Sequence, residues 1–103
     1  MYFVGIDVGT GSVRAALVSH AGEIFAQASR PLQTWTYEED SRLYEQSSAQ
    51  IWHALAECVR TLVEQSRVRP EEVRGIGFDA TCSLVAVKKD TGQPHCITPQ
   101  HLP

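Results

Sequence analysis

Hydrophobic residues in the first third of the chain fall in short runs that are typical of β-strands. Tyr2–Val8 is rich in β-branched and aromatic residues and predicts a short buried strand. A glycine-containing turn at 9–11 ends it, and Ser12–Ser19 has the length and composition of a second strand. After another turn at 20–22, residues 23–29 alternate loosely between apolar and polar side chains and predict a third strand. Three strands joined by short turns would form an antiparallel meander.

Helical spacing replaces this pattern in the middle of the chain. Residues 31–45 are polar and aromatic without periodicity, so we expect a loop there. Ser47, with Gln50 three residues later, matches a capping box at the start of a helix. The apolar positions that follow recur at helical spacing: Ile51, Leu55, Cys58, Val59, Leu62 and Val63. The pattern predicts a helix from Ser48 to Ser66 that packs through Ile51, Leu55, Leu62 and Val63, with Cys58 as a small buried apolar residue.

The second half of the chain predicts two further strands. Pro70 cannot lie inside a helix but suits a first turn, so we expect a short helical turn at 70–73. Gly75–Asp79 and Leu84–Val87 have the composition of a fourth and a fifth strand, and a turn follows at 88–92.

The order of these elements predicts an α/β fold. A meander, then a helix, then a strand that can pair parallel to the first is an α/β pattern. With 103 residues the chain is at most one small domain, and we expect it to be part of a larger one. Residues after Pro94 show no periodicity. We therefore expect a partial domain over residues 1–93 and a divergent, unstructured tail over 94–103.

Composition and charge exclude several classes of partner. The formal net charge of −3 favours neither nucleic acid nor an anionic membrane surface as a partner. No apolar stretch is long enough to span a membrane, and no secretory leader is visible. Three cysteines without close spacing argue against a disulfide framework and favour a cytoplasmic location. His95, Cys96 and His101 fit no zinc-binding spacing, and the oligomeric state is left open.

The segment from Asp7 to Arg14 is the clearest candidate for chemistry. A hairpin that contains glycines lets backbone N–H groups approach phosphate oxygens closely, and Thr10 and Ser12 add hydroxyl donors. Asp7, at the end of a buried strand, is a suitable oxygen group for Mg²⁺, through water molecules because Mg²⁺ dehydrates reluctantly. Arg14 either neutralises charge on a transferring phosphoryl group or simply faces solvent.

A structural explanation of the same segment stays open at this point. In an ordinary β-hairpin, Gly9 and Gly11 would serve only the turn. The segment is neither a Walker A loop nor a dinucleotide fingerprint, since it has no Gly-Lys-Ser/Thr and no helix follows its glycines.

Three segments together resemble the FGGY carbohydrate kinases. VGIDVGTGSVRAALV (4–18) is similar to the first phosphate motif of the sugar kinase, Hsp70 and actin superfamily, and YEQSSAQIW (44–52) is similar to the E-Q-x-x-x-x-x-W segment of FGGY kinases. GIGFDATCSLVAV (75–87) resembles their G-I-G strand and the hairpin that reaches the sugar pocket. The resemblance covers residues 2–93 and implies an incomplete ribonuclease H-like N-terminal domain.

The resemblance implies an ATP-dependent sugar kinase with ATP and Mg²⁺ as cofactors. It places Asp7 beside the magnesium ion and Gly9, Thr10, Gly11 and Ser12 beside the nucleotide phosphates. Glu45 and Gln46 are expected to fix the helix entry rather than to touch sugar.

The resemblance also suggests the sugar. Thr81, Cys82 and Ser83 match the family's sugar-facing positions, and the form D-A-T-C-S looks like the ribulokinase branch. Glycerol kinases carry Gln-Arg-Glu there, and xylulokinases carry Gln-Met-His. A ketopentose, with D-ribulose as the best candidate, is the expected substrate.

The chain departs from the family after the fifth predicted strand. The W-x-D-x-R segment, the aspartate general base and the glycine-rich adenosine site of these kinases have no counterpart in the sequence. We therefore expect the chain to be inactive by itself. The alternatives are an Hsp70- or actin-like ATPase module, or a truncated non-catalytic product that acts only as a binding module.

Overall fold

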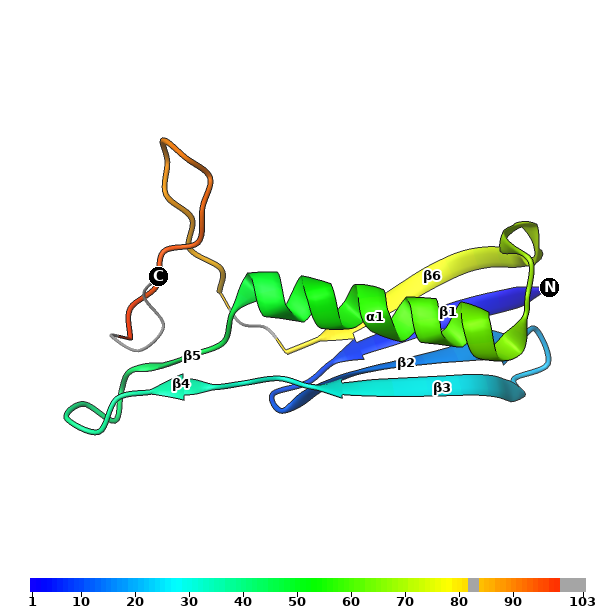
Figure 1. Ribbon diagram of the computed structural model, residues 1–103, viewed down its shortest axis with the longest axis horizontal. Helices are drawn as coiled ribbons and strands as arrows, with labels where there is room; N and C mark the ends of the chain where they lie inside the picture. The colour runs from blue at the N-terminus through cyan, green and yellow to red at the C-terminus, as the bar shows by residue number, and fades with distance from the viewer. Residues whose placement is uncertain (82–83, 99–103) are drawn as a thin grey trace.

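The computed structural model describes residues 1–81 and 84–98 of the chain. Its main element is a four-stranded sheet, made of β1 (Tyr2–Val8), β2 (Ser12–Ser19), β3 (Ile24–Pro31) and β6 (Val73–Ala80) in the order β3-β2-β1-β6 (Figure 1). The first three strands form an antiparallel meander, and β6 pairs parallel with β1. The predicted α/β fold, with a meander, a helix and a returning parallel strand, is confirmed.

Strand ends differ from the prediction mainly where pairing extends them. β1 and β2 have the predicted bounds. β3 starts one residue later than predicted and continues to Pro31, which lies opposite Ser12 in the register. A proline is acceptable there because β3 is an edge strand. β6 forms the other edge and runs from Val73 to Ala80 because its pairing with β1 covers that whole length.

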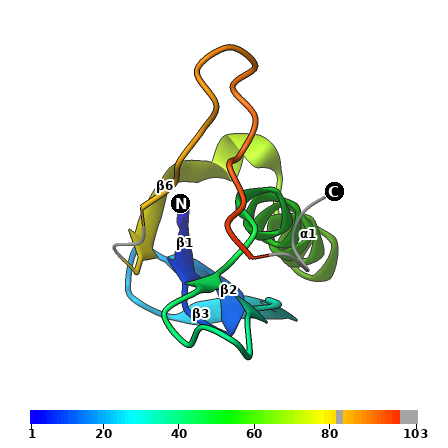
Figure 2. The same ribbon diagram turned by 90° about the vertical axis from the view of Figure 1, so that its left-hand side faces the viewer.

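Helix α1 (Ser48–Ser66) lies across one face of the sheet, over β2 and β3 (Figure 2). Ser47 is its N-cap, and the Ser47 hydroxyl accepts a hydrogen bond from the amide of Gln50 at 3.1 Å. The second half of the capping box is absent, because the side-chain oxygen of Gln50 accepts from the amide of Gln33 at 2.8 Å instead.

Within the described residues, no helix is long and apolar enough to cross a membrane.

The core lies between α1 and the sheet. Its helix side consists of Ala54, Leu55, Cys58 and Leu62, and its sheet side is dominated by Val4, Ile6, Val13, Ala15, Leu17 and Ala26. Val63 was expected to pack here but is 43% exposed, because it follows Leu62 and is rotated away from the buried stripe. Cys58 is fully buried, as predicted, and burial raises the pKa of its thiol.

The segment 31–45, predicted to be a loop, contains two short strands. β4 (Trp35–Thr36) and β5 (Tyr44–Glu45) pair antiparallel and extend beyond the end of the main sheet (Figure 1). The single 3₁₀ turn η1 (Pro70–Glu72) confirms the predicted helical turn before β6.

The prediction of a strand at Leu84–Val87 is wrong. Val87 makes only an isolated bridge to Pro94, and Leu84 is 93% exposed, because this segment stands away from the sheet and has no strand to extend (Figure 2). The predicted turn at 88–92 is confirmed by the amide of Gly92, which donates to the carbonyl of Lys88 at 2.8 Å.

Within the predicted tail at 94–103, the structure describes residues 94–98 and places Thr98 against β5. Thr98 is fully buried, and its amide donates to the carboxylate of Glu45 at 2.8 Å. Local sequence pattern could not reveal this contact, because the partner lies on β5. Residues 99–103, including His101, lie outside the described residues, and the division of the chain after Gln93 stays a prediction.

Candidate functional site

The turn between β1 and β2 does not need its glycines for backbone conformation. The amide of Gly9 donates to the carbonyl of Ser12 at 2.9 Å and closes the turn. Neither Gly9 nor Gly11 adopts the left-handed conformation that favours glycine. A Cβ added at Gly11 would meet nothing within 4 Å. The explanation of Gly9 and Gly11 as pure turn residues is therefore weakened.

This turn is held through its carbonyl groups. The side-chain amide of Gln46 donates to the carbonyl of Thr10 at 2.6 Å and to that of Gly9 at 3.4 Å. The amide of Leu32 donates to the carbonyl of Gly11 at 2.9 Å. Among the described residues, the amides of Thr10 and Gly11 donate to no protein acceptor, and both residues are exposed. The turn thus presents backbone donors, an arrangement that suits an anion.

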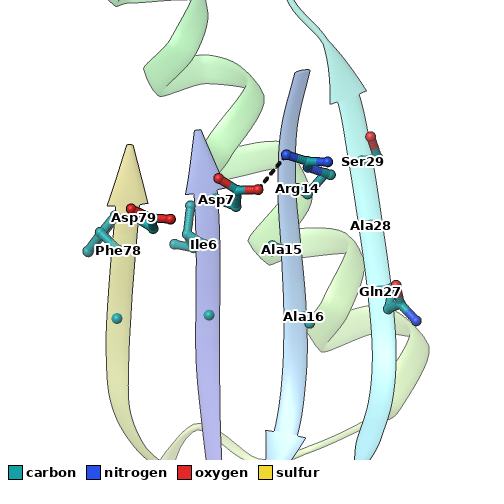
Figure 3. A pocket seen from close by; sticks show the side chains of 12 residues that line it. Ile6, Asp7, Arg14, Ala15, Ala16, Gln27, Ala28, Ser29, Phe78 and Asp79 are labelled. Carbon is teal, nitrogen blue, oxygen red and sulfur yellow. Dashed lines mark hydrogen bonds and ion pairs between the residues drawn. The ribbon is translucent and has the colours of Figure 1, made fainter. Parts of the chain in front are cut away.

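Asp7 and Arg14 form an ion pair beside this turn. They lie opposite each other in the β1–β2 register, and the guanidinium of Arg14 donates to the carboxylate of Asp7 (Figure 3). The side chains are 47% and 58% exposed, respectively. A Cβ at Gly9 would lie 3.4 Å from Nη2 of Arg14, so the guanidinium also lies against the turn. Of the two roles expected for Arg14, contact with solvent is shown; a role toward phosphate stays a prediction.

The sheet face opposite α1 carries an open hollow of about 660 Å³ (Figure 3). Gly5, Gly77 and Ala16 form its floor as one register row across β1, β6 and β2. Two further lining residues, Asp7 and Asp79, lie in register on the parallel strands. The hollow therefore has a floor almost without side chains and a polar row at the end nearest the turn.

The expected sugar-facing triplet is described only at its first residue. Thr81 is exposed, and its amide donates to the carbonyl of Val8 at 3.2 Å, so it lies beside the start of the β1–β2 turn. Cys82 and Ser83 lie outside the described residues.

Sequence reasoning assigned too small a role to Glu45 and Gln46. Both were expected only to fix the helix entry. Gln46 instead contacts the turn at Gly9 and Thr10, and Glu45 contacts the segment at 97–98. The signal was present in the segment YEQSSAQIW, but its role depends on long-range contacts.

Comparison with known proteins agrees with this architecture. Residues 2–97 match the FGGY family of carbohydrate kinases, N-terminal domain. The chain is 46% identical over 98 residues to the D-ribulokinase of Saccharomyces cerevisiae, a match that covers 95% of this chain and 13% of the yeast protein. It is 49% identical over 88 residues to the FGGY carbohydrate kinase domain-containing protein of Homo sapiens, which covers 85% of this chain and 15% of the human protein.

Solved structures show the same fold. The xylulose kinase from Rhodospirillum rubrum superposes with a TM-score of 0.73 and 25% sequence identity, over 92% of this chain and 19% of that one. The chain thus spans between 13% and 19% of the length of these relatives. On the match of residues 2–97 to the N-terminal domain model, the chain belongs to the FGGY family of carbohydrate kinases.

Proposed function

We propose that the chain is the nucleotide-phosphate-binding part of an ATP-dependent kinase that phosphorylates a ketopentose, with D-ribulose as the best candidate. The structure of the β1–β2 turn is the observation that supports nucleotide-phosphate binding. Its carbonyls are held by Gln46 and Leu32, and the amides of Thr10 and Gly11 face solvent at the end of the sheet. Family membership favours this function over an Hsp70- or actin-like ATPase module.

The residues of the turn divide the binding of ATP between them. The amides of Thr10 and Gly11 donate to phosphate oxygens, and the hydroxyls of Thr10 and Ser12 add further donors. Arg14 lies against the turn and contributes positive charge. Fixed donors of this kind stabilise charge during phosphoryl transfer because they need not reorient at the moment of reaction.

The carboxylates fit a hydrated Mg²⁺. Asp7 and Asp79 share one end of the open sheet face, and oxygen ligands are those that Mg²⁺ prefers. Asp7 is assigned to hold the ion through water, and the bound ion would supply charge neutralisation at the phosphates.

The choice of sugar rests on the triplet Thr81-Cys82-Ser83 and on the similarity to the yeast D-ribulokinase. Small side chains in the triplet would leave room for a hydroxyl-rich ketose. The test is sugar-dependent ADP release by a complete kinase that carries residues 2–97. Faster turnover of ribulose than of glycerol is expected, and glycerol as the best substrate would overturn the assignment.

Phosphate binding can be tested on the chain itself. Gly11→Ala adds a methyl group where the structure has open space, so it should leave folding intact while it crowds the two amides. Loss of one hydrogen bond to a charged group corresponds to roughly a tenfold weaker affinity for Mg-ATP. Gln65→Ala, at an exposed position of α1 away from the turn and from the hollow, is the control. Equal Mg-ATP affinity of the two variants in calorimetry would contradict the proposal.

A further inference from the structure

Glu45 holds the segment after the turn at 88–92. Its Oε1 accepts hydrogen bonds from the amide of Ile97 at 3.0 Å, the amide of Thr98 at 2.8 Å and the hydroxyl of Thr98 at 2.6 Å. Its Oε2 accepts a further bond from the amide of Ile97 at 3.1 Å. Two consecutive amides and a hydroxyl thus converge on one carboxylate, and Thr98 is fully buried. Hydrogen bonds to a charged acceptor are the stronger kind in proteins.

The adjacent residue, Gln46, contacts the β1–β2 turn instead. The side-chain amide of Gln46 donates to the carbonyls of Gly9 and Thr10. These residues belong to the β1–β2 turn at 9–11, which is proposed to bind phosphate and is named the phosphate turn for that reason. Glu45 ends β5, and Gln46 lies between β5 and the N-cap of α1. Side chains of adjacent residues in extended chain point in opposite directions. One short segment therefore reaches the phosphate turn on one side and the segment at 97–98 on the other.

The backbone on both sides of Glu45 and Gln46 is held in place by neighbouring elements. Tyr44 and Glu45 pair with Thr36 and Trp35, and the next residue after Gln46 is the helix cap Ser47. Glu45 and Gln46 are thus adjacent in a short stretch of backbone that is held by strand pairing on one side and by the helix cap on the other.

We propose that Glu45 and Gln46 are positioning residues that set the phosphate turn and the segment 84–98 in a fixed relation to each other. The segment 84–98 begins just after the triplet Thr81-Cys82-Ser83 that is expected to face the sugar. The pair would therefore align the nucleotide side of the site with its acceptor side. This catalytic consequence rests on the proposed function; the physical coupling does not.

The coupling is measured by amide hydrogen exchange and NMR on the 103-residue chain. Glu45→Ala should speed exchange at the amides of Ile97 and Thr98 by roughly 10- to 100-fold, the equivalent of losing hydrogen bonds to a charged acceptor. Glu45→Gln keeps one acceptor oxygen and should restore part of the protection. Because the pair is coupled, Glu45→Ala should also shift the amide resonances of Thr10 and Gly11.

Exposed residues of α1 provide matched controls. Glu64→Ala and Gln65→Ala remove the same side-chain types from exposed helix positions and should change neither region. Unchanged exchange at Ile97 and Thr98 in Glu45→Ala would overturn the role of Glu45. Altered exchange there, with an unshifted turn, would show a local anchor and overturn the coupling. If Glu45→Ala loses protection throughout the chain, the test uses Glu45→Gln instead. Exchange at Ile97 and Thr98 and the resonances of Thr10 and Gly11 then decide between the same outcomes.

A complete kinase that carries residues 2–97 provides the catalytic readout. Glu45→Gln should lower kcat several-fold and leave the KM values for sugar and ATP nearly unchanged, because alignment rather than binding is impaired. A raised KM with unchanged kcat would contradict an alignment role. Absence of any kinase activity in the unaltered protein would instead refute the proposed function and leave the exchange result intact.

Discussion

The guanidinium of Arg14 donates to the carboxylate of Asp7 across the β1–β2 pair, so a cation and an anion of the candidate site are in direct contact. Each is about half exposed. Exposed ion pairs of this kind contribute only about 0–1 kcal/mol to stability. Their contact therefore gives little structural reason for either residue, and both can be tested for function without loss of the fold.

Asp7→Asn should depress turnover in a complete kinase that carries residues 2–97. If Asp7 holds Mg²⁺ through water, it acts on the transferring phosphoryl group and not on the bound sugar. Turnover at saturating Mg-ATP should fall by about 10- to 100-fold, as for other outer-sphere metal contacts, with sugar binding nearly unchanged. Asp90→Asn, in the exposed turn at 88–92, is the control. Near-normal turnover of Asp7→Asn would make Asp7 a structural strand-end residue.

Arg14→Gln should leave the unfolding free energy within about 1 kcal/mol of the original protein, because the pair that it breaks is exposed. Affinity of the chain for Mg-ATP should nevertheless fall, since positive charge beside the phosphate turn is removed. Urea unfolding and calorimetry of the same sample separate the two effects. A variant that unfolds much more readily, with unchanged Mg-ATP affinity, would assign Arg14 a structural role.

Adjacent residues on α1 should respond very differently to truncation. Leu62 is 1% exposed and Val63 is 43% exposed. Leu62→Ala should lower the unfolding free energy by about 2–5 kcal/mol, enough to unfold a marginally stable chain. Val63→Ala should cost well under half as much in chemical denaturation. Similar losses at both positions would mean that the helix is rotated relative to the sheet.

The thiol of Cys58 should report on opening of the core. It is fully buried, and burial raises its pKa, so the reactive thiolate is scarce in the folded chain. Alkylation of Cys58 at neutral pH, followed by mass spectrometry of its peptide, should be slow in buffer and rapid in denaturant. Cys96, which is only partly buried, should react earlier. Equal rates at the two thiols in buffer would contradict the packing of α1.

We expect the 103-residue chain alone to show no sugar-dependent turnover. Phosphoryl transfer needs a base positioned beside the acceptor hydroxyl. Asp7 is assigned to the Mg²⁺, and Asp79 lies exposed to water near the end of β6, so neither carboxylate of the site is expected to act as this base. A coupled assay for ADP release, with and without ribulose, checks this. Robust sugar-dependent turnover would show that the catalytic base lies within these residues.

The local sequence pattern was sufficient to predict the elements whose structure depends on their own side chains. β1, β2 and α1 have the predicted bounds because alternation and helical spacing are properties of those segments. The parallel pairing of β6 with β1 followed from the order of the elements.

Long-range contacts explain what the pattern could not predict. β4 and β5 are two residues each, and it is their pairing with each other that makes them strands. Thr98 is buried where Glu45 binds it. Gln50 does not complete the capping box because its side-chain oxygen accepts a hydrogen bond from the amide of Gln33. At the site, phosphate binding by the β1–β2 turn was predicted from its glycines and stays a prediction, whereas the contact of this turn with Gln46 joins distant segments that local pattern does not connect.

Strand β6 also sets how the chain will behave in concentrated solution. Among the described residues it forms the outer edge of the sheet, and Ile76 and Phe78 are 56% and 63% exposed. An open edge flanked by apolar side chains is a template for strands of other molecules. Self-association should therefore rise steeply with protein concentration, and a lysine in place of Phe78 should raise the solubility limit without disturbing the phosphate turn.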